Sequence, residues 1–203
     1  MSDPLLLIGC GGHARALIDV VESSGRWHVL GLVGLPEQVG EELLGYPVLG
    51  CDQDLPALRQ QCVHALLAVG QIGLSAQRHR LAAQLGRLDF VLPVVISGHA
   101  HVSRHAQLGI GTSVGHGVIV NAGARVGDCC ILNSNVLIEH DAVIGDYCHV
   151  STGVLVNGGA IIGERSFIGS GAVLREGLNL PPQTVISAGK RVMGWPMWEE
   201  RLQ

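Results

Sequence analysis

The strongest constraint on this chain is an aliphatic residue that recurs every six positions through its second half. When the sequence is divided into hexads from Val94, the third residue of every hexad is Ile, Leu or Val, from Ile96 to Val192 without a break. Small residues lie mostly two positions earlier, and Gly, Asn, Ser and Asp crowd the last three positions of the hexads. Those residues adopt turn conformations with positive φ at low cost. The pattern predicts short strands joined by tight turns and stacked repeatedly, with one aliphatic side chain of each strand pointing inward.

The composition fits a narrow core of this kind. Hydrophobic residues make up 47% of the chain but aromatic residues only 3%, so the interior is built from aliphatic side chains. The 29 glycines are about twice the usual share of roughly 7%. A charged fraction of 15% and a mean hydropathy of +0.36 exclude a disordered chain.

Several other protein classes are excluded by the same sequence. No apolar run approaches the length of about 18 residues that a membrane-spanning helix needs. A net charge of −4 with 13 Lys and Arg residues argues against nucleic-acid binding. The six cysteines form no C-x-x-C pair, which argues against zinc ribbons and redox dithiols. The first residues, 1–4, carry no basic segment typical of a secretory signal, so we expect a cytoplasmic protein with reduced cysteines.

The first 93 residues show a different pattern, in which strands and helices alternate. Strands are predicted at 5–8, 28–33 and 65–69, and helices at about 16–25 and 75–85. We therefore expect a small α/β unit of Rossmann type over 1–93, the repeats over 94–195 and a short tail over 196–203. The first strand and helix are joined by a glycine-rich turn that contains Gly11, Gly12 and His13. Such a turn can bind an anion at the helix N-terminus, or it can be a tight connection without a ligand.

The hexads resemble the hexapeptide-repeat acyltransferase family, whose repeats wind a left-handed parallel β-helix with three faces and 18 residues per coil. The resemblance covers 94–195, which holds nearly six coils. The segment GCGGHAR near the N-terminus, together with NSNVLIEHD in the repeats, is similar to the sugar acetyltransferases of bacterial surface-glycan pathways. That group includes nucleotide-linked amino-sugar N-acetyltransferases and related sialic-acid O-acetyltransferases. The resemblance implies an acetyl-CoA site between subunits of a homotrimer and a sugar nucleotide held by the α/β unit.

The same resemblance assigns a catalytic base. The family motif I-E-H-[ED] matches at His140, and an imidazole with a pKa near 6.5 can take a proton from an attacking amine or hydroxyl at neutral pH. Glu139 and Asp141 flank this histidine, and we favour Asp141 as the acid that orients the ring. The residues one coil away, Ala122 and Gly158, are small and leave space for a ligand. The alternative is a polar turn segment without a catalytic role.

The resemblance also places both substrates. It implies that acetyl-CoA is bound by His149, Gly158, Ser170, Gly171, Ala188 and Lys190. It implies that the sugar nucleotide is bound by Gly11, Gly12, His13 and Asn133. His149 lies nine residues after His140, which is half a coil, so the two can cooperate only across a subunit interface. A surface residue on a strand is the alternative for His149, and a solvated end-of-helix charge for Lys190.

Two observations limit the prediction. Family members that bind UDP-sugars often carry paired aspartates after the second strand, where this chain has Gly34 and Leu35, which favours another nucleotide or a free sugar over a UDP-sugar. Hexapeptide carbonic anhydrases use an H-x4-H pair to bind metal, and the repeats here contain none. A metal site is therefore not expected, although His99, His101 and His105 lie close together in the sequence.

We therefore predict a cytoplasmic homotrimer that transfers an acetyl group from acetyl-CoA to the amino group of a sugar, preferably a nucleotide-linked one, with His140 as general base. An O-acetyltransferase acting on a sugar hydroxyl is one alternative. A non-enzymatic scaffold that binds a sugar nucleotide is another. The sequence leaves the sugar and its nucleotide undetermined.

Overall fold

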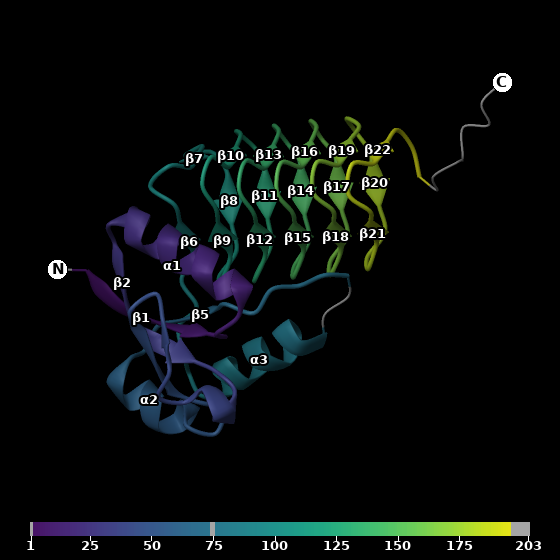
Figure 1. Ribbon diagram of the computed structural model, residues 1–203. Coiled ribbons are helices and arrows are strands. Elements are labelled where there is room, and N and C mark those ends of the chain that lie inside the picture. The colour runs from purple at the N-terminus through teal and green to yellow at the C-terminus, as the bar shows by residue number, and fades with distance from the viewer. Residues whose placement is uncertain (1, 74–75, 196–203) are drawn as a thin grey trace.

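The computed structural model describes residues 2–73 and 76–195, so the predicted tail at 196–203 lies outside the described residues. An α/β unit comes first, and a long stack of short strands follows it (Figure 1). The elements of the first unit are β1 Asp3–Ile8, α1 Gly12–Ser24, β2 Trp27–Val33, η1 Pro36–Gln38, β3 Glu42–Leu43, β4 Tyr46–Gly50, α2 Leu55–Gln61, β5 Ala65–Leu67 and α3 Ala76–Arg87. This architecture confirms the predicted fold class.

The α/β unit is built on one five-stranded sheet with the strand order β3-β4-β2-β1-β5. Its strands run parallel except β3, which pairs antiparallel with β4. The central strand β1 is apolar and buried from Leu5 to Ile8, as expected for a strand covered on both faces. Helix α1 ends at Gly25, which adopts a left-handed φ of 66° and stops the helix. The carboxyl ends of β1, β2, β4 and β5 therefore meet at one edge of the unit.

The repeats form seventeen two-residue strands in three parallel sheets. The first face contains β6 Val95–Ile96, β9 Ser113–Val114, β12 Ile131–Leu132, β15 His149–Val150, β18 Phe167–Ile168 and β21 Val185–Ile186. The second face contains β7 His101–Val102, β10 Ile119–Val120, β13 Leu137–Ile138, β16 Leu155–Val156, β19 Val173–Leu174 and β22 Arg191–Val192. The third face contains β8 Gln107–Leu108, β11 Arg125–Val126, β14 Val143–Ile144, β17 Ile161–Ile162 and β20 Asn179–Leu180. Paired residues are 18 positions apart, so the three faces close a parallel β-helix.

The hexad pattern has a direct structural cause. The second residue of each strand is the predicted aliphatic position, and from Val114 onward these side chains are buried in one continuous core. From Gly111 to Gly189 the sixth residue of every hexad has a positive φ, between 53° and 78°. Eight of these residues are glycines, and the others include Asp141. The turns therefore use left-handed conformations at a fixed interval, which is why glycine is abundant in this half of the chain.

The two units pack directly on each other. Val95 joins the core that α1 covers, and Cys129 joins the core beneath α3. Arg78 of α3 is only 1% exposed, and its guanidinium donates hydrogen bonds to the carbonyl oxygens of Val69 and Cys129. On the other side, the Asp19 carboxylate of α1 lies 2.9 Å from Nε2 of His116 in the β-helix. These contacts hold the carboxyl edge of the α/β sheet against the first face.

Candidate active site

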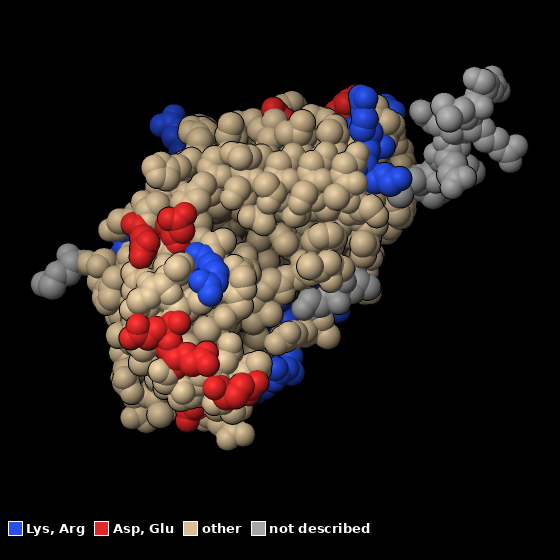
Figure 2. Space-filling view, viewed as in Figure 1, with Lys and Arg blue, Asp and Glu red and all other residues tan. Residues whose placement is uncertain are grey.

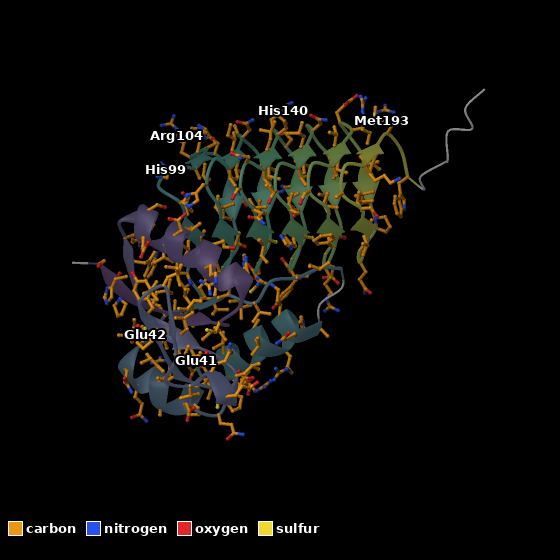
Figure 3. The ribbon with its side chains drawn as sticks, in the orientation of Figure 1. Glu41, Glu42, His99, Arg104, His140 and Met193 are labelled. Carbon is orange, nitrogen blue, oxygen red and sulfur yellow. The ribbon has the colours of Figure 1, made fainter. Side chains whose placement is uncertain are left out.

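His140 lies in the turn between the second and third faces, on the edge of the β-helix that points away from the α/β unit (Figure 3). Its side chain is 67% exposed, and its Nδ1 lies 3.0 Å from Oδ2 of Asp141. Because a carboxylate only accepts hydrogen bonds, Nδ1 carries the proton in the neutral ring. Nε2 is then left with a lone pair, the state that a general base requires.

Gly158, one coil further on, leaves room for this ring. A Cβ atom at residue 158 would lie 2.6 Å from Nε2 of His140, so only glycine permits the observed position. The surrounding residues form a groove that we call the His140 groove, lined by Glu139, His140, Asn157, Gly158, Glu176 and Gly177. The free imidazole nitrogen therefore lies in an open groove beside a backbone that carries no side chain.

The two acids next to His140 have different surroundings. Asp141 contacts the imidazole, and its φ of 60° puts it in the left-handed turn conformation. The Glu139 carboxylate instead accepts hydrogen bonds from Nδ2 of Asn121 at 2.9 Å and from the backbone N–H of His140 at 3.2 Å. The hydrogen bond that Nδ1 of His140 donates to Asp141, followed by the charges of Asp141 and Glu139, raises the pKa of His140 above 6.5.

A second group of predicted residues meets in a cavity between the two units. Gly11, Gly12, His13, Asn133 and His149 all line this inter-unit cavity of about 670 Å³, together with the loop 68–72. The first three come from the glycine turn and the start of α1, and the last two from the first face of the β-helix. The structure thus brings the predicted sugar-nucleotide residues and His149 together, but it does not bring His140 to them.

His149 is buried rather than a surface residue, because the loop after β5 covers it. Its Nδ1 donates a short hydrogen bond to the carbonyl oxygen of Gln71, so Nε2 of the neutral ring is an acceptor. Burial, with a contribution from the positive charge of Arg78, lowers the pKa of His149 and lowers the pKa of His13 to about 3. Nε2 of each ring is buried and has no hydrogen-bond partner. Two imidazoles beside this cavity therefore each keep one buried nitrogen without a partner.

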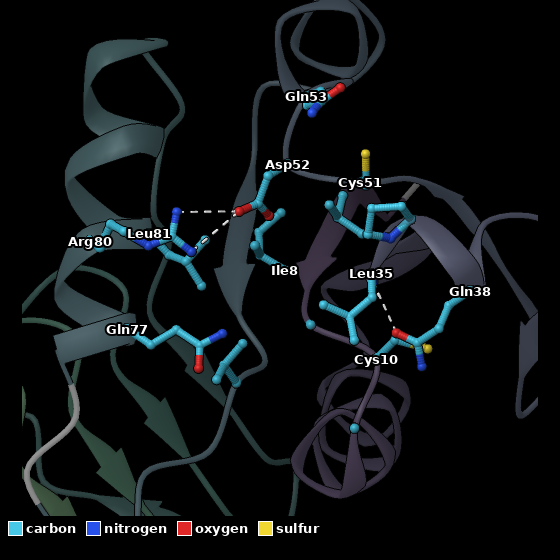
Figure 4. Close-up of a pocket in the computed structure, with 16 residues that line it drawn as sticks. Ile8, Cys10, Leu35, Gln38, Cys51, Asp52, Gln53, Gln77, Arg80 and Leu81 are labelled. Carbon is cyan, nitrogen blue, oxygen red and sulfur yellow. Dashed lines mark hydrogen bonds and ion pairs between the residues drawn. The ribbon is translucent and has the colours of Figure 1, made fainter.

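A third site was missed by the sequence analysis. The ends of β1, β2, β4 and β5 enclose a cavity of about 440 Å³, here called the strand-end cavity (Figure 4). It is lined by Ile8, Gly9, Cys10, Gly11, Val33, Gly34, Leu35, Pro36, Gln38, Cys51, Asp52, Gln53, Val69, Gln77, Arg80 and Leu81. Gly9, Cys10, Gly11 and Val69 also line the inter-unit cavity, so the two cavities adjoin at the glycine turn. Much of the wall of the strand-end cavity comes from α3, η1 and the turn after β4, where the sequence contains no recognisable motif.

The remaining predicted acetyl-CoA residues lie on a different edge of the β-helix from His140. Ser170, Gly171 and Ala188 occupy turns between the first and second faces, and Lys190 follows them; all four are exposed. Oγ of Ser170 lies 2.9 Å from Oγ of Ser151. His140 and Gly158 occupy the edge between the second and third faces. One chain therefore does not assemble all the predicted acetyl-CoA residues into one site.

Metal sites and membrane spans are absent from the described part of the chain. Residues 2–73 and 76–195 contain no group of three or more His, Cys, Asp or Glu side chains placed to hold a metal ion. No helix in these ranges is long and apolar enough to cross a membrane. The six cysteines are free thiols, and Cys62, Cys129, Cys130 and Cys148 are buried.

Comparison with known proteins identifies relatives over both units. A family model described as the PglD N-terminal domain matches residues 4–85, and one described as the GMPPB C-terminal domain matches residues 90–192. No curated protein matches the sequence.

Solved structures resemble the chain over most of its length. PerB from Caulobacter crescentus, in complex with CoA and GDP-perosamine, is 32% identical and has a TM-score of 0.85, covering 94% of this chain and 90% of that chain. In two further structures of the Caulobacter enzyme one histidine is replaced, by asparagine or by alanine.

The acetyltransferase domain of PglB from Neisseria gonorrhoeae, in complex with acetyl coenzyme A, is 29% identical with a TM-score of 0.83, covering 93% of this chain and 90% of that chain. WeeI from Acinetobacter baumannii, 20% identical with a TM-score of 0.61 over 93% of this chain and 95% of that chain, shares the fold. Because a relative is 32% identical over 94% of this chain and the PglD N-terminal domain model matches residues 4–85, this chain belongs to the PglD-like family of hexapeptide-repeat sugar N-acetyltransferases.

Proposed function

We propose that this protein transfers an acetyl group from acetyl-CoA to the amino group of a nucleotide-linked amino sugar used in surface-glycan synthesis. The observation that carries the proposal is the exposed His140, whose Nδ1 is held by Asp141 and whose Nε2 is free above Gly158. Family membership supports the reaction class, since relatives were solved with CoA, acetyl-CoA and GDP-perosamine. We expect the enzyme to act in the cytoplasm, where acetyl-CoA is available.

His140 is the proposed general base. The amine nitrogen of the sugar attacks the thioester carbonyl carbon, Nε2 of His140 removes the amine proton, and the carbon–sulfur bond breaks to release CoA. The proton can then pass from the imidazolium to the departing thiolate. Asp141 stabilises the imidazolium, and the backbone N–H of Gly158 is a candidate donor to the developing oxyanion. Glu139 supports the turn through the backbone of His140.

The acceptor is proposed to bind across the two adjoining cavities of the α/β unit. The nucleoside fits the strand-end cavity, and the diphosphate fits the glycine turn, where α1 begins without a side-chain cap or an acidic residue in its first turn. The sugar then extends into the inter-unit cavity, beside His13 and Asn133. Residues 1–93 would thus hold the acceptor, and 94–195 the donor.

The donor is proposed to bind between subunits. His140 and Gly158 lie on one edge of the β-helix, whereas His149, Ser170, Gly171, Ala188 and Lys190 lie on or beside the first face. A second copy can place the side that carries these residues against the His140 edge and so complete the site. In that site, His149 would lie beside the pantetheine arm.

The surface around His140 supports assembly with further copies. Ile119 and Leu155 on the second face and Ile161 on the third face are exposed aliphatic side chains on either side of the His140 edge. An aliphatic surface next to the base is suited to a homotrimer interface.

The charged side chains lie elsewhere on the face shown in Figure 2. Lys and Arg gather near the C-terminal end of the β-helix, and Asp and Glu gather on the α/β unit.

The proposal is tested by measuring thiol release from acetyl-CoA with UDP-, GDP-, dTDP- and CMP-linked amino sugars, and with a free amino sugar. We expect release with a nucleotide-linked amino sugar, and a rate about 10²- to 10⁴-fold lower for His140→Ala. The affinity of that variant for acetyl-CoA, measured by calorimetry, should stay within about 2-fold because the base contributes little to donor binding. Absence of acetyl-CoA binding by the wild-type protein would exclude the enzyme and favour a scaffold that binds sugar nucleotides.

The same assay separates N-transfer from O-transfer. An alcohol needs the base more than a neutral amine does, so an O-acetyltransferase would lose all activity on replacement of His140, even at high pH. An N-acetyltransferase would keep slow transfer at high pH, where the amine is neutral. Mass spectrometry of the product identifies the acetylated atom.

A further inference from the structure

We propose that the strand-end cavity recognises guanine, so that the acceptor is a GDP-linked sugar, with Asp52 and Arg80 as the residues that read the base. This inference rests on the proposed function and specifies the nucleotide that the enzyme accepts. Among the described residues that line the cavity, Asp52 is the single carboxylate and Arg80 the single cation. Their Oδ2 and Nη2 atoms lie 3.4 Å apart, in the turn after β4 and on α3 (Figure 4).

This pair matches the edge of only one common base. Guanine presents two adjacent donors, N1–H and the 2-amino group, and a carboxylate can accept from both. Guanine also presents O6 and N7 as acceptors, the pair that arginine binds in bidentate fashion. Uracil places its single N–H between two carbonyl oxygens, which a carboxylate repels. Adenine and cytosine place a ring acceptor beside their amino group.

The geometry of the cavity keeps Asp52 available for a ligand. Gln84 donates a hydrogen bond of 3.2 Å to the backbone oxygen of Asp52, and Asp54 accepts one of 2.8 Å from the backbone N–H of Cys51. The turn that carries Asp52 is therefore anchored through its backbone. The side chains of Asp52 and Arg80 are 41% and 59% exposed, and their ion pair is long, so both can turn toward an incoming base.

The other side of the cavity supplies no second carboxylate. A Cβ atom at Gly34 would lie 3.0 Å from both Oε1 of Gln38 and Cγ1 of Val48, so a larger side chain there would require these neighbours to move. Leu35 is 57% exposed, and its backbone N–H donates to Oε1 of Gln38. An exposed leucine at the rim of a cavity offers an apolar surface for the flat face of a base. Asp52 and Arg80 would then recognise the polar edge of the same base.

The test is a calorimetric titration of the full chain with GDP, IDP, UDP, ADP and CDP. IDP lacks the 2-amino group of GDP but is otherwise the same nucleotide. For the wild-type protein we expect GDP to bind about 10- to 100-fold more tightly than UDP, ADP and CDP, and several-fold more tightly than IDP. Asp52→Ala should weaken GDP binding about 10- to 100-fold and remove the difference between GDP and IDP. Arg80→Gln should weaken GDP and IDP equally.

Glu37→Ala is the matched control, because Glu37 is an exposed carboxylate on η1 that does not line the cavity. This variant should bind every nucleotide as the wild-type protein does. An equal loss of all five nucleotides in Asp52→Ala would overturn the proposal and assign Asp52 to the ribose hydroxyls instead. Preference of the wild-type protein for UDP would also overturn it, while leaving the proposed acetyltransferase intact. If none of the nucleotides binds, guanine recognition is wrong, and thiol release with a free amino sugar then decides whether the proposed reaction class still holds.

Discussion

The protonation states of three histidines differ because their surroundings differ. His140 is exposed and hydrogen-bonded to a carboxylate, which raises its pKa. His149 and His13 are largely buried and lie near the positive charge of Arg78, so their pKa values are lowered. These surroundings favour the protonated form of His140 and the neutral forms of the other two.

The hydrogen bond between Asp141 and His140 leads to a pH-dependent prediction. The base acts in its neutral form, so the rate rises as pH increases through the raised pKa of His140. Asp141→Asn removes the carboxylate, and the rise should move to lower pH. We expect kcat/KM at neutral pH to fall about 10- to 100-fold, because the ring loses its orienting partner. Asn tolerates the positive φ at this turn, so folding should be retained.

The measurement is the pH profile of kcat/KM for the wild-type protein, Asp141→Asn and Glu164→Gln. Glu164 is an exposed carboxylate on another edge of the β-helix, and its replacement should leave the profile unchanged. An unchanged acidic limb in Asp141→Asn would show that Asp141 does not control the pKa of the base.

His13 leads to a prediction about acid stability. Its pKa is about 3 in the folded protein, against 6.5 for an unperturbed histidine, so protons bind preferentially to the unfolded chain. The contribution of His13 to stability is complete above about pH 6.5 and is lost progressively as pH falls toward its folded pKa. His13→Gln should reduce the dependence of the unfolding free energy on pH below about 6.5, by at most about 1.4 kcal/mol per pH unit. Urea unfolding at a series of pH values measures this, and parallel curves for the two proteins would contradict it.

At the scale of elements, the repeats depend on turns more than on strands. Each strand has two residues, and the left-handed turn at the sixth hexad position sets the direction of the next strand. Gly153 is one such turn residue, with a φ of 68°, and a Cβ atom added there would meet no other atom within 4 Å. Its substitutions are therefore limited by backbone conformation and not by space.

This position offers a clean comparison of two side chains. Gly153→Val should destabilise the protein by about 1–3 kcal/mol, because a β-branched residue is strained at positive φ. Gly153→Asn should cost clearly less, since Asn tolerates this conformation. Chemical denaturation of both variants measures the difference. Equal losses would show that crowding in an assembled state, and not φ, limits this turn.

Helices and strands were predictable from the sequence where the hydrophobic pattern is regular and long enough. Strand β1 and helix α1 follow from a buried apolar run, a glycine turn and a helical stripe. Strands β3 and β4 and helix α2 were missed, because they are short and their sequences lack a clear period. The placement of β4 depends on its pairing with β2, and so on packing rather than on local pattern.

At the scale of the whole molecule, the two halves of the proposed site lie on different sides of one chain. His140 points away from the α/β unit (Figure 3), while His149 is buried beneath the loop that contains Gln71, whose carbonyl oxygen accepts its hydrogen bond. If the active site forms between subunits, each site takes His140 from one chain and His149 from its neighbour. Two inactive variants can then restore activity when they are combined.

We expect His140→Ala and His149→Ala to be nearly inactive alone and to recover activity after mixing, unfolding and refolding together. In randomly mixed homotrimers about a quarter of the sites would carry both intact histidines. Thiol release by the mixture, compared with each variant refolded alone, measures the recovery. No recovery, with trimers confirmed by light scattering, would place the whole site within one chain.

The sequence by itself determined the parts of this protein that depend on neighbours in the chain or on a fixed repeat. The hexads predicted stacked short strands, and their resemblance to hexapeptide repeats implied the β-helix, in which each coil of 18 residues meets the next in the same register. The order of residues in the chain also predicted the contact between His140 and Asp141, since consecutive residues in a tight turn remain close in the fold.

Only the tertiary structure decided which distant residues meet. Gln71 and His149 are 78 positions apart, and Asp52 and Arg80 are 28 apart, yet each pair is in contact. Such pairs form because α3 and the loop after β5 are held against the β-helix by Arg78 and by a shared apolar core. No periodicity or local motif encodes that docking, so the two cavities and their polar residues emerge only when the units pack together.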